Sequence, residues 1–170
     1  IRFEHVCFSY PNAGTETLHD ISFELDLSKS TAIVGENGSG KTTIIKLLCG
    51  LYQPTSGRIL FDEYDIRNLN NGEIGKAIKV VFQDFFQYEL TIRENIGFGN
   101  LARISHDLEL QEVLDAVHLE ELKKLGLNTS LGKLEHEGID LSRGQWQRLA
   151  VGRIFLNDTA YAVLDEPTAS

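Results

Sequence analysis

The sequence lacks long hydrophobic runs and a basic surplus. No apolar stretch approaches the roughly 20 residues that a membrane-spanning helix needs, and the N-terminal residues show no signal-peptide pattern. Lys and Arg number 16 against 25 Asp and Glu, which gives a formal net charge of −9. A protein that binds nucleic acid regardless of sequence needs a basic surface, so we expect no nucleic acid among the partners.

Cysteine is also scarce. The only two, Cys7 and Cys49, lack the spacing of a metal-binding cysteine pair and suit a reducing cytosol. The sequence has no internal repeat and no low-complexity segment. Hydrophobic residues make up 42% of the 170, which is enough for a folded core. This length predicts one domain, or one domain with an inserted lobe.

The most informative stretch, Gly35–Thr43, fits the G-x-x-x-x-G-K-[ST] pattern of a phosphate-binding loop, the Walker A motif. Before it, Thr31–Val34 predicts a short buried parallel strand. After it, apolar residues recur with helical spacing as far as Leu51, and Gly50 is a helix stop signal. Such a loop turns its N–H groups and the positive end of the helix toward a phosphate. The predicted nucleotide-binding residues here are Gly35, Asn37, Gly38, Ser39, Gly40, Lys41, Thr42 and Thr43.

Two side chains of this loop have specific expected roles. Lys41 is expected to reach the β- and γ-phosphates of a nucleoside triphosphate, and the Thr42 hydroxyl to coordinate Mg²⁺. The alternative is a Gly-rich surface turn that fits the pattern by chance. The strand and helix signals on either side favour the nucleotide site.

Short strands are predicted at residues 1–8, 17–27, 58–61 and 79–82. Tyr10 follows the first strand, and its ring would either stack on adenine or belong to an ordinary turn; the spacing favours neither. Gln83 ends the last of these strands, where α/β sheets bind their ligands. Its amide could reach Mg²⁺ or an attacking water, although a strand-end glutamine is more often only a loop residue.

Between residues 88 and 155 the pattern changes from strands to helices, which predicts a helical lobe inserted into an α/β core. An apolar face at 110–117 follows Ser105, a predicted N-cap, and Leu119–Leu125 predicts a further short helix. Ser142 and Gln145 then form an S-x-x-Q capping box. The apolar side of the helix that it opens comprises Trp146, Leu149, Ala150 and Ile154.

The capping box has two interpretations. Ser142 either caps the helix and nothing more, or its hydroxyl, the Gly144 N–H and the helix dipole form a second anion site. The final segment, Tyr161–Glu166, predicts a buried strand that delivers two carboxylates to the carboxyl edge of the sheet. Asp165 would hold Mg²⁺ through water, and Glu166 would orient or deprotonate the attacking water. A solvated strand end is the less favoured alternative.

The order and spacing of Gly35–Thr43, Gln83, Leu141–Gln145 and Tyr161–Glu166 resemble the ATP-binding cassette (ABC) ATPases over nearly the whole chain. The pentapeptide Leu-Ser-Arg-Gly-Gln carries most of the specificity, because other P-loop ATPases and GTPases lack it. The resemblance makes Tyr10 the adenine-stacking aromatic, Gln83 the Q-loop glutamine and Glu166 the catalytic carboxylate. It assigns Ser142, Gly144 and Gln145 to the signature motif.

The resemblance implies an α/β fold with three parts. These are a P-loop NTPase core with a mostly parallel sheet and flanking helices, an N-terminal antiparallel β subdomain, and an inserted α-helical subdomain. Within one ABC ATPase domain, residues 1–87 and 156–170 would form the ATP-binding core and residues 88–155 the helical signature subdomain.

The family implies binding and hydrolysis of ATP with Mg²⁺, a head-to-tail dimer with a second ABC ATPase domain, and attached transmembrane domains. Val81–Asp84, Thr91–Ile96 and Gly138–Asp140 resemble bacterial peptide or lantibiotic exporters. This subtype carries its membrane domains on the same polypeptide and would lie at the cytoplasmic face of a bacterial cell membrane. Glu135 and Glu137 resemble the loop that contacts the membrane domain.

Two departures from the family pattern affect these expectations. Arg143 replaces the commoner signature glycine, at a position where we expect variation to be tolerated. No histidine follows the Asp-Glu strand, so we expect the chain to end before the family's switch histidine and, alone, to bind ATP weakly and hydrolyse it poorly. One alternative is a soluble ABC ATPase of DNA repair or translation, which the acidic charge disfavours. Another is a cassette that binds ATP without hydrolysis, which the intact Glu166 disfavours.

Overall fold

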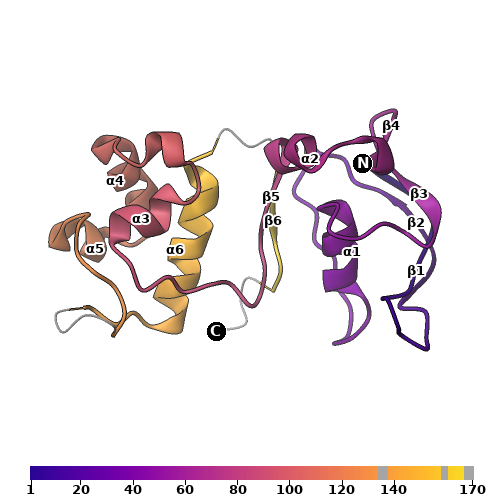
Figure 1. Cartoon of the computed structure of the whole chain (residues 1–170), viewed down its shortest axis with the longest axis horizontal. Helices are drawn as coiled ribbons and strands as arrows, with labels where there is room; N and C mark the ends of the chain where they lie inside the picture. The colour runs from indigo at the N-terminus through magenta and orange to yellow at the C-terminus, as the bar shows by residue number, and fades with distance from the viewer. Residues whose placement is uncertain (134–137, 158–160, 167–170) are drawn as a thin grey trace. The chain divides into compact units, whose positions relative to one another are not determined.

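The computed structural model describes residues 1–133, 138–157 and 161–166 (Figure 1). The chain divides into two compact units, unit 1 at residues 1–79 and unit 2 at residues 80–170, and each is described here by itself. Within the described ranges, no helix combines the length and the apolar character that crossing a bilayer requires. The α/β class and the N-terminal antiparallel sheet predicted from the sequence are confirmed.

Unit 1 contains a four-stranded antiparallel sheet in the order β2-β1-β3-β4. The core side chains of β1 are Phe3, Val6 and Phe8. The predicted alternation is interrupted at Glu4 and His5, where the pairing with β2 shifts register. The fourth strand was not predicted, because two residues are too few to show a strand pattern. It follows a turn at Asp62, whose φ of 51° lies in the left-handed region. The strands are β1 (Arg2–Phe8), β2 (Leu18–Glu24), β3 (Ser56–Phe61) and β4 (Tyr64–Asp65).

The helices of unit 1 are α1 (Lys41–Leu48), the 3₁₀ turn η1 (Ile66–Asn68) and α2 (Asn71–Ala77). The predicted stop at Gly50 is confirmed. The N–H groups of Gly50 and Leu51 donate to carbonyls of the last turn of α1, both at 3.0 Å, which is the Schellman pattern. Leu51, which the spacing placed on the apolar face, is exposed because it lies beyond this stop.

The strand predicted at Thr31–Val34 is not formed. Residues 31–36 have no regular secondary structure, and Val34 is 88% exposed. A parallel strand exists only through hydrogen bonds to neighbouring strands, and among the described residues no strand pairs with this segment. The prediction from β-branched composition was therefore wrong, because composition does not supply a partner.

Unit 2 is a helical cluster around one apolar core. Its largest fully buried side chains come from α3, α4, α6 and the segments between them, and they include Ile92, Leu110 and Leu149. All of these helices fall in the stretch that the sequence predicted to be helical. They are α3 (Ile92–Gly97), the 3₁₀ turn η2 (Leu101–Arg103), α4 (Asp107–Ala116), α5 (Glu120–Leu125) and α6 (Arg143–Phe155).

The N-cap predicted for α4 was wrong by one residue. His106, not Ser105, is the N-cap, and no side-chain cap hydrogen bond forms there. The His106 Nδ1 atom lies 2.8 Å from the carboxylate of Glu109, and this pair holds the first turn instead. By contrast, α3 begins with an unpredicted capping box between Thr91 and Glu94.

The strands β5 (Ile78–Val81) and β6 (Tyr161–Leu164) form a two-stranded sheet. The Asp165 N–H donates to the Val81 carbonyl at 2.9 Å, so both strands end at the same level and run parallel, as Figure 1 shows. The strand predicted at the end of the chain is thus formed. It is less buried than predicted, with Leu164 40% exposed, because the described residues give it one neighbouring strand.

A half-buried arginine, Arg153, links the elements of unit 2. Arg153 on α6 donates from Nε to the Asn95 carbonyl and from Nη2 to the Asn95 side-chain oxygen, both at 3.0 Å. Its Nη1 donates to the Phe86 carbonyl at 3.1 Å, and its Cζ lies 4.7 Å from the centre of the Tyr88 ring. Burial lowers the pKa of the Arg153 guanidinium from its ordinary value. The Arg153 guanidinium thus connects α6 to α3 and to the segment that contains Phe86 and Tyr88.

We predict that Arg153→Met lowers the free energy of unfolding by about 2–4 kcal/mol, because the buried Asn95 oxygens lose their donor. Urea unfolding followed by circular dichroism measures this loss. Arg148→Met, an exposed arginine on the same helix, is the matched control and is expected to cost much less. Equal losses in the two variants would contradict the bridging role of Arg153.

Candidate functional site

The predicted phosphate loop of unit 1 ends at a glycine that no other residue can replace without strain. Gly40 is the N-cap of α1, and its φ of 93° is a backbone conformation that L side chains rarely adopt. A Cβ at this position would lie 2.6 Å from the Leu18 side chain on β2. The N–H of Ile44 donates to the Gly40 carbonyl at 2.9 Å and starts the helix. The chain thus turns from loop to helix against the sheet.

Lys41 lies over the carbonyls of its own loop. Its Nζ donates to the carbonyl oxygens of Gly35 and Glu36, both at 2.9 Å. The first turn of α1 carries no acidic residue, so the ammonium and the positive helix end act in the same direction. This corner of unit 1 is suited to attract an anion such as a phosphate.

Tyr10 is attached to the same helix. Its Oη lies 3.1 Å from Oγ1 of Thr43, a buried residue two positions after Lys41. The Tyr10 ring packs edge-on against Phe8 and Tyr52, with centroid separations of 4.9 and 5.2 Å. The structure therefore brings Tyr10 to the helix of the phosphate loop. Stacking of its ring on a base stays a prediction.

We predict that Tyr10→Phe lowers the free energy of unfolding by about 1 kcal/mol, because the buried Thr43 hydroxyl loses its partner while the aromatic packing remains. Thermal denaturation measures the difference. The exposed Tyr64 on β4 provides the matched change, Tyr64→Phe, which is expected to be neutral. A loss in the Tyr64 variant as large as in the Tyr10 variant would show that the hydrogen bond to Thr43 contributes nothing specific.

In unit 2, the candidate catalytic and metal-binding residues lie at one edge of the two-stranded sheet. Gln83 follows the end of β5 by two residues, and Asp165 and Glu166 follow the end of β6. Since the strands are parallel and end together, the three residues leave the sheet at its carboxyl edge, where α/β folds bind ligands.

These three residues differ in environment. Asp165 is a buried acid, 5% exposed, whereas Gln83 is exposed. Glu166 has a φ of 49°, in the left-handed region that non-glycine residues rarely occupy. Such strain occurs often at functional positions. No pattern in the sequence predicted this backbone conformation.

The capping box predicted in the signature segment is formed. The Ser142 hydroxyl accepts from the Gln145 N–H at 3.2 Å, and the Gln145 side chain accepts from the Ser142 N–H at 2.8 Å. The Gln145 amide also donates to the Glu121 carboxylate of α5 at 3.2 Å. A Cβ at Gly144 would meet nothing within 4 Å, so packing within the described structure does not require glycine there.

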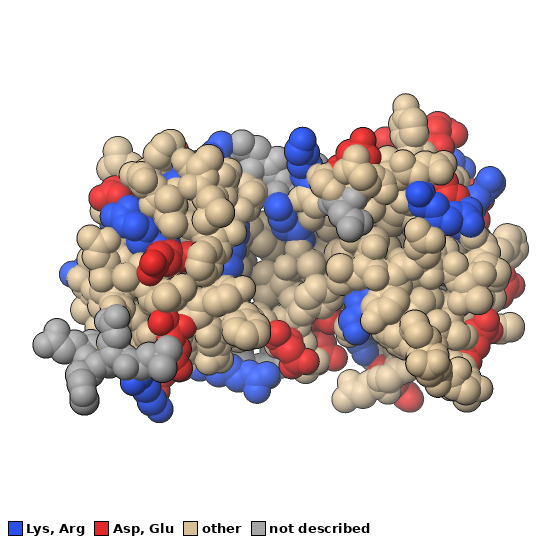
Figure 2. Space-filling model, viewed as in Figure 1, with Lys and Arg blue, Asp and Glu red and all other residues tan. Residues whose placement is uncertain are grey.

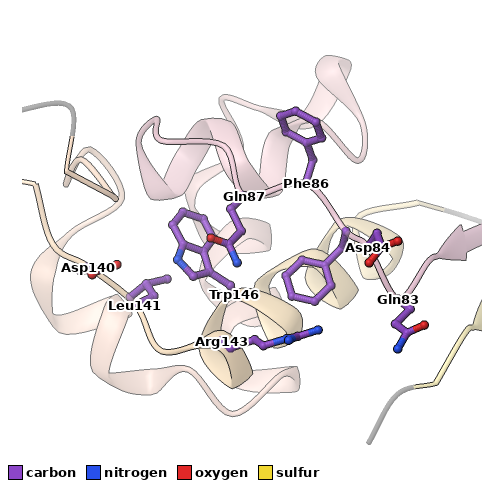
Figure 3. Close-up of a pocket in the computed structure, with 9 residues that line it drawn as sticks. Gln83, Asp84, Phe86, Gln87, Asp140, Leu141, Arg143 and Trp146 are labelled. Atoms are coloured by element: carbon purple, nitrogen blue, oxygen red, sulfur yellow. The ribbon is translucent and has the colours of Figure 1, made fainter. Parts of the chain in front are cut away.

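A pocket of about 560 Å³ lies in unit 2 between the segment after β5 and the start of α6. Figure 3 shows Trp146 and Arg143 facing the segment Gln83–Gln87, while the Phe86 ring points away from Trp146. Phe86 is 71% exposed, which is unusual for a large aromatic side chain. The lining residues are Gln83, Asp84, Phe85, Phe86, Gln87, Asp140, Leu141, Arg143 and Trp146.

The aromatic part of this pocket was not predicted from the sequence. Phe85 and Phe86 stand together in an otherwise polar stretch, and that pairing was the signal available. Glu135 and Glu137, predicted to contact a membrane domain, lie outside the described residues. On the face drawn in Figure 2, Lys and Arg side chains stand singly or in small groups among acidic ones. The expectation of no nucleic-acid partner stays a prediction.

Comparisons with known proteins agree with the motifs. Residues 18–169 match the family described as ABC transporter. The chain is 42% identical over 171 residues to the subtilin transport ATP-binding protein SpaT of Bacillus subtilis, and the match covers 99% of this chain and 28% of SpaT. It is 41% identical over 173 residues to the nisin transport ATP-binding protein NisT of Lactococcus lactis subsp. lactis, and the match covers 100% of this chain and 29% of NisT.

A solved structure also matches: that of a bacterial Atm1-family ABC exporter with ATP bound. It superimposes with a TM-score of 0.87 at 31% identity, over 99% of this chain and 29% of that one. The chain thus spans less than a third of the length of the curated relatives named here. The family match covers most of the chain and includes the phosphate loop, the signature segment and the Asp-Glu strand. The chain therefore belongs to the ABC transporter family, as an ATP-binding domain.

Proposed function

We propose that this chain is the ATP-hydrolysing domain of a bacterial exporter that carries its transmembrane domains on the same polypeptide. One observation carries the proposal: a single chain has a phosphate loop at the start of α1 and a Leu-Ser-Arg-Gly-Gln segment at the start of α6. The names and lengths of the relatives support the export function. Their names also favour a peptide of the lantibiotic type as the transported substrate.

The proposed ATP-binding roles begin with the phosphate loop. Its backbone N–H groups and Lys41 bind the phosphates, and the ammonium exchanges its contacts with the Gly35 and Glu36 carbonyls for phosphate oxygens. The Tyr10 ring stacks on the adenine. The support in unit 1 is the corner formed by Gly40, Lys41 and the Tyr10–Thr43 hydrogen bond.

Mg²⁺ is the proposed metal cofactor. The residues proposed to hold it are Thr42, Gln83 and Asp165, which offer a hydroxyl, an amide oxygen and a carboxylate. These are hard oxygen donors of the kind that Mg²⁺ prefers, so the donor set fits this ion. When bound, the ion would neutralise charge on the β- and γ-phosphates.

We propose that Glu166 is the catalytic carboxylate. Its carboxylate oxygen accepts a proton from, or orients, the water that attacks the γ-phosphate. Gln83 assists by holding the same water through its amide. The position of both residues just beyond the carboxyl ends of β5 and β6 supports these roles. The family's switch histidine is expected after the Asp-Glu strand, whereas the last histidine of these 170 residues is His136. We therefore further propose that the 170 residues alone hydrolyse ATP slowly.

The proposed partner in catalysis is a second ABC ATPase domain, arranged head to tail. The Ser142 hydroxyl, the Gly144 N–H and the dipole of α6 would bind the nucleotide held by the phosphate loop of that partner, and Gln145 would hold the segment in place. Gly144 supports this idea. A glycine inside a helix costs about 1 kcal/mol relative to alanine, and no contact within the described structure requires it.

The pocket beside Gln83 is the proposed contact with the membrane domains. It combines an exposed Phe86 with Asp84, Asp140 and Arg143 at its edge, which suits a helix end bearing both apolar and charged groups. A contact there would join membrane movement to the segment that carries Gln83. This arrangement would place the domain at the cytoplasmic face of the cell membrane.

We predict that Glu166→Gln in the full-length polypeptide, reconstituted in lipid, lowers ATP turnover about a hundredfold or more, because the general base is lost. Retained ATP binding, measured with a fluorescent analogue, would show that the nucleotide site persists. If the unaltered protein binds ATP but never turns it over, a cassette that only binds nucleotide becomes the better account.

A second prediction separates the two interpretations of the signature segment. Gly144→Ala should leave the thermal unfolding midpoint unchanged or raised, because a helical glycine is removed from open space, yet it should lower ATP turnover at least about tenfold. Its matched control is Gly75→Ala on α2, a helical glycine where a Cβ also meets nothing within 4 Å. Equal turnover in the two variants would contradict an anion site at the start of α6 and would mean that this segment only caps the helix.

Ser142→Asp provides an independent test of the same segment. Aspartate is a good N-cap, so the helix is expected to keep its stability, while the added negative charge repels a phosphate. We expect turnover to fall while affinity for Mg-ADP at the phosphate loop stays within about twofold. Full turnover in this variant would exclude an anion at the start of α6.

A further inference from the structure

Three metal-ligating side chains of different types meet on the surface of unit 1, on the residues that flank Leu18 and the strand paired with it. They are Cys7 on β1, Glu16 in the loop between β1 and β2, and His19 on β2. One ligand atom of each lies within 4.8 Å of the other two. The spacing of the two cysteines from each other does not indicate this group, because its other two members are a glutamate and a histidine.

An irregularity of the sheet creates the group. Val6 pairs with Ile21 and Phe8 with Leu18, so two steps along β1 face three steps along β2, and the extra residue forms a bulge. Asp20 in this bulge has a φ of 49°, and its N–H donates to Cys7 Sγ at 3.3 Å. Bulges redirect side chains, and this one accompanies the approach of His19 to Cys7.

The histidine and the carboxylate are already in contact. His19 Nδ1 lies 2.5 Å from a carboxylate oxygen of Glu16, and both side chains are accessible to solvent. Thr17, between them, donates its N–H to the Phe8 carbonyl at 2.8 Å and closes the loop beside Cys7. Cys7 and His19 are therefore held on paired strands and Glu16 lies next to the hydrogen-bonded Thr17, while the exposed side chains can still rotate.

We propose that Cys7, Glu16 and His19 bind a zinc-like divalent cation, with water as the fourth ligand. Thiolate, imidazole and carboxylate are the three ligand types of tetrahedral zinc sites, and sulfur and nitrogen select zinc over Mg²⁺ or Ca²⁺. Around zinc, ligand atoms lie about 3–4 Å apart, so separations of up to 4.8 Å close by small rotations of exposed side chains. A thiolate and a carboxylate also balance the charge of the ion.

A bound ion would join the loop that carries Tyr10 to both strands of the hairpin. It would stabilise unit 1 whether or not nucleotide is present, because binding to the folded state alone shifts the unfolding equilibrium. The proposal does not rest on the proposed ATPase function. Its test therefore uses metal binding and stability as readouts.

The first experiment titrates the reduced full chain with Co²⁺, which substitutes for zinc and gives a thiolate-to-cobalt absorption band. We expect this band in the unaltered chain and its replacement by Zn²⁺. Cys7→Ser should abolish it, whereas Cys49→Ser should retain it, because Cys49 is the other free cysteine and lies outside the group. Absence of the band in the unaltered chain, or its persistence in Cys7→Ser, would overturn the proposal.

The second experiment does not alter the half-buried cysteine. Zn²⁺ should raise the thermal unfolding midpoint of the unaltered chain, and His19→Ala or Glu16→Gln should weaken Co²⁺ binding at least about tenfold. His106→Ala removes a histidine from a comparable exposed His–Glu pair on α4 and should leave metal binding unchanged. If His106→Ala weakens binding as much as His19→Ala, the ion is held by surface His–Glu pairs in general and the proposed site is wrong.

Discussion

The close approach of Gly40 to the Leu18 side chain is the constraint on which unit 1 depends. It lets the phosphate loop turn into α1 directly against β2, in a backbone conformation that a larger residue would not tolerate. Lys41 and the buried Thr43 follow from that turn, and Thr43 in turn fixes Tyr10. A loop that binds phosphate through its backbone needs such a fixed framework, since its N–H groups cannot adjust one by one.

In unit 2, α6 carries both the contacts that stabilise the unit and the residues proposed to meet a nucleotide. Its N-terminal end is held by the reciprocal bonds of Ser142 and Gln145, and its C-terminal half by the Arg153 cation beneath Asn95. The first end exposes groups proposed to meet a nucleotide, whereas the second binds the segment that follows Gln83. A shift of the helix along its axis would thus affect both ends at once. This gives a physical basis for coupling between the signature segment and the segment that carries Phe86.

Sequence reasoning succeeded where the determining interactions are local. The Ser142 cap and the Gly50 stop each depend on residues within one helical turn, so their patterns predicted the structure. It failed where a distant partner decides. Thr31–Val34 has strand composition but no paired strand, and Cys7 reaches His19 only through a bulge between two strands. The pocket residues likewise come from segments more than 50 positions apart. Short patterns carry no information about such pairings.

If Lys41 binds phosphate as proposed, its two bonds to its own loop make that binding an exchange of contacts. The ammonium has partners in the Gly35 and Glu36 carbonyls, each at 2.9 Å. A ligand gains only the difference between the new contacts and the old ones. An anion of low charge would therefore gain little net binding free energy at Lys41. A polyphosphate, with several charged oxygens presented together, would outcompete the carbonyls, so under the proposed role the self-contact of Lys41 would act as a threshold for ligand charge.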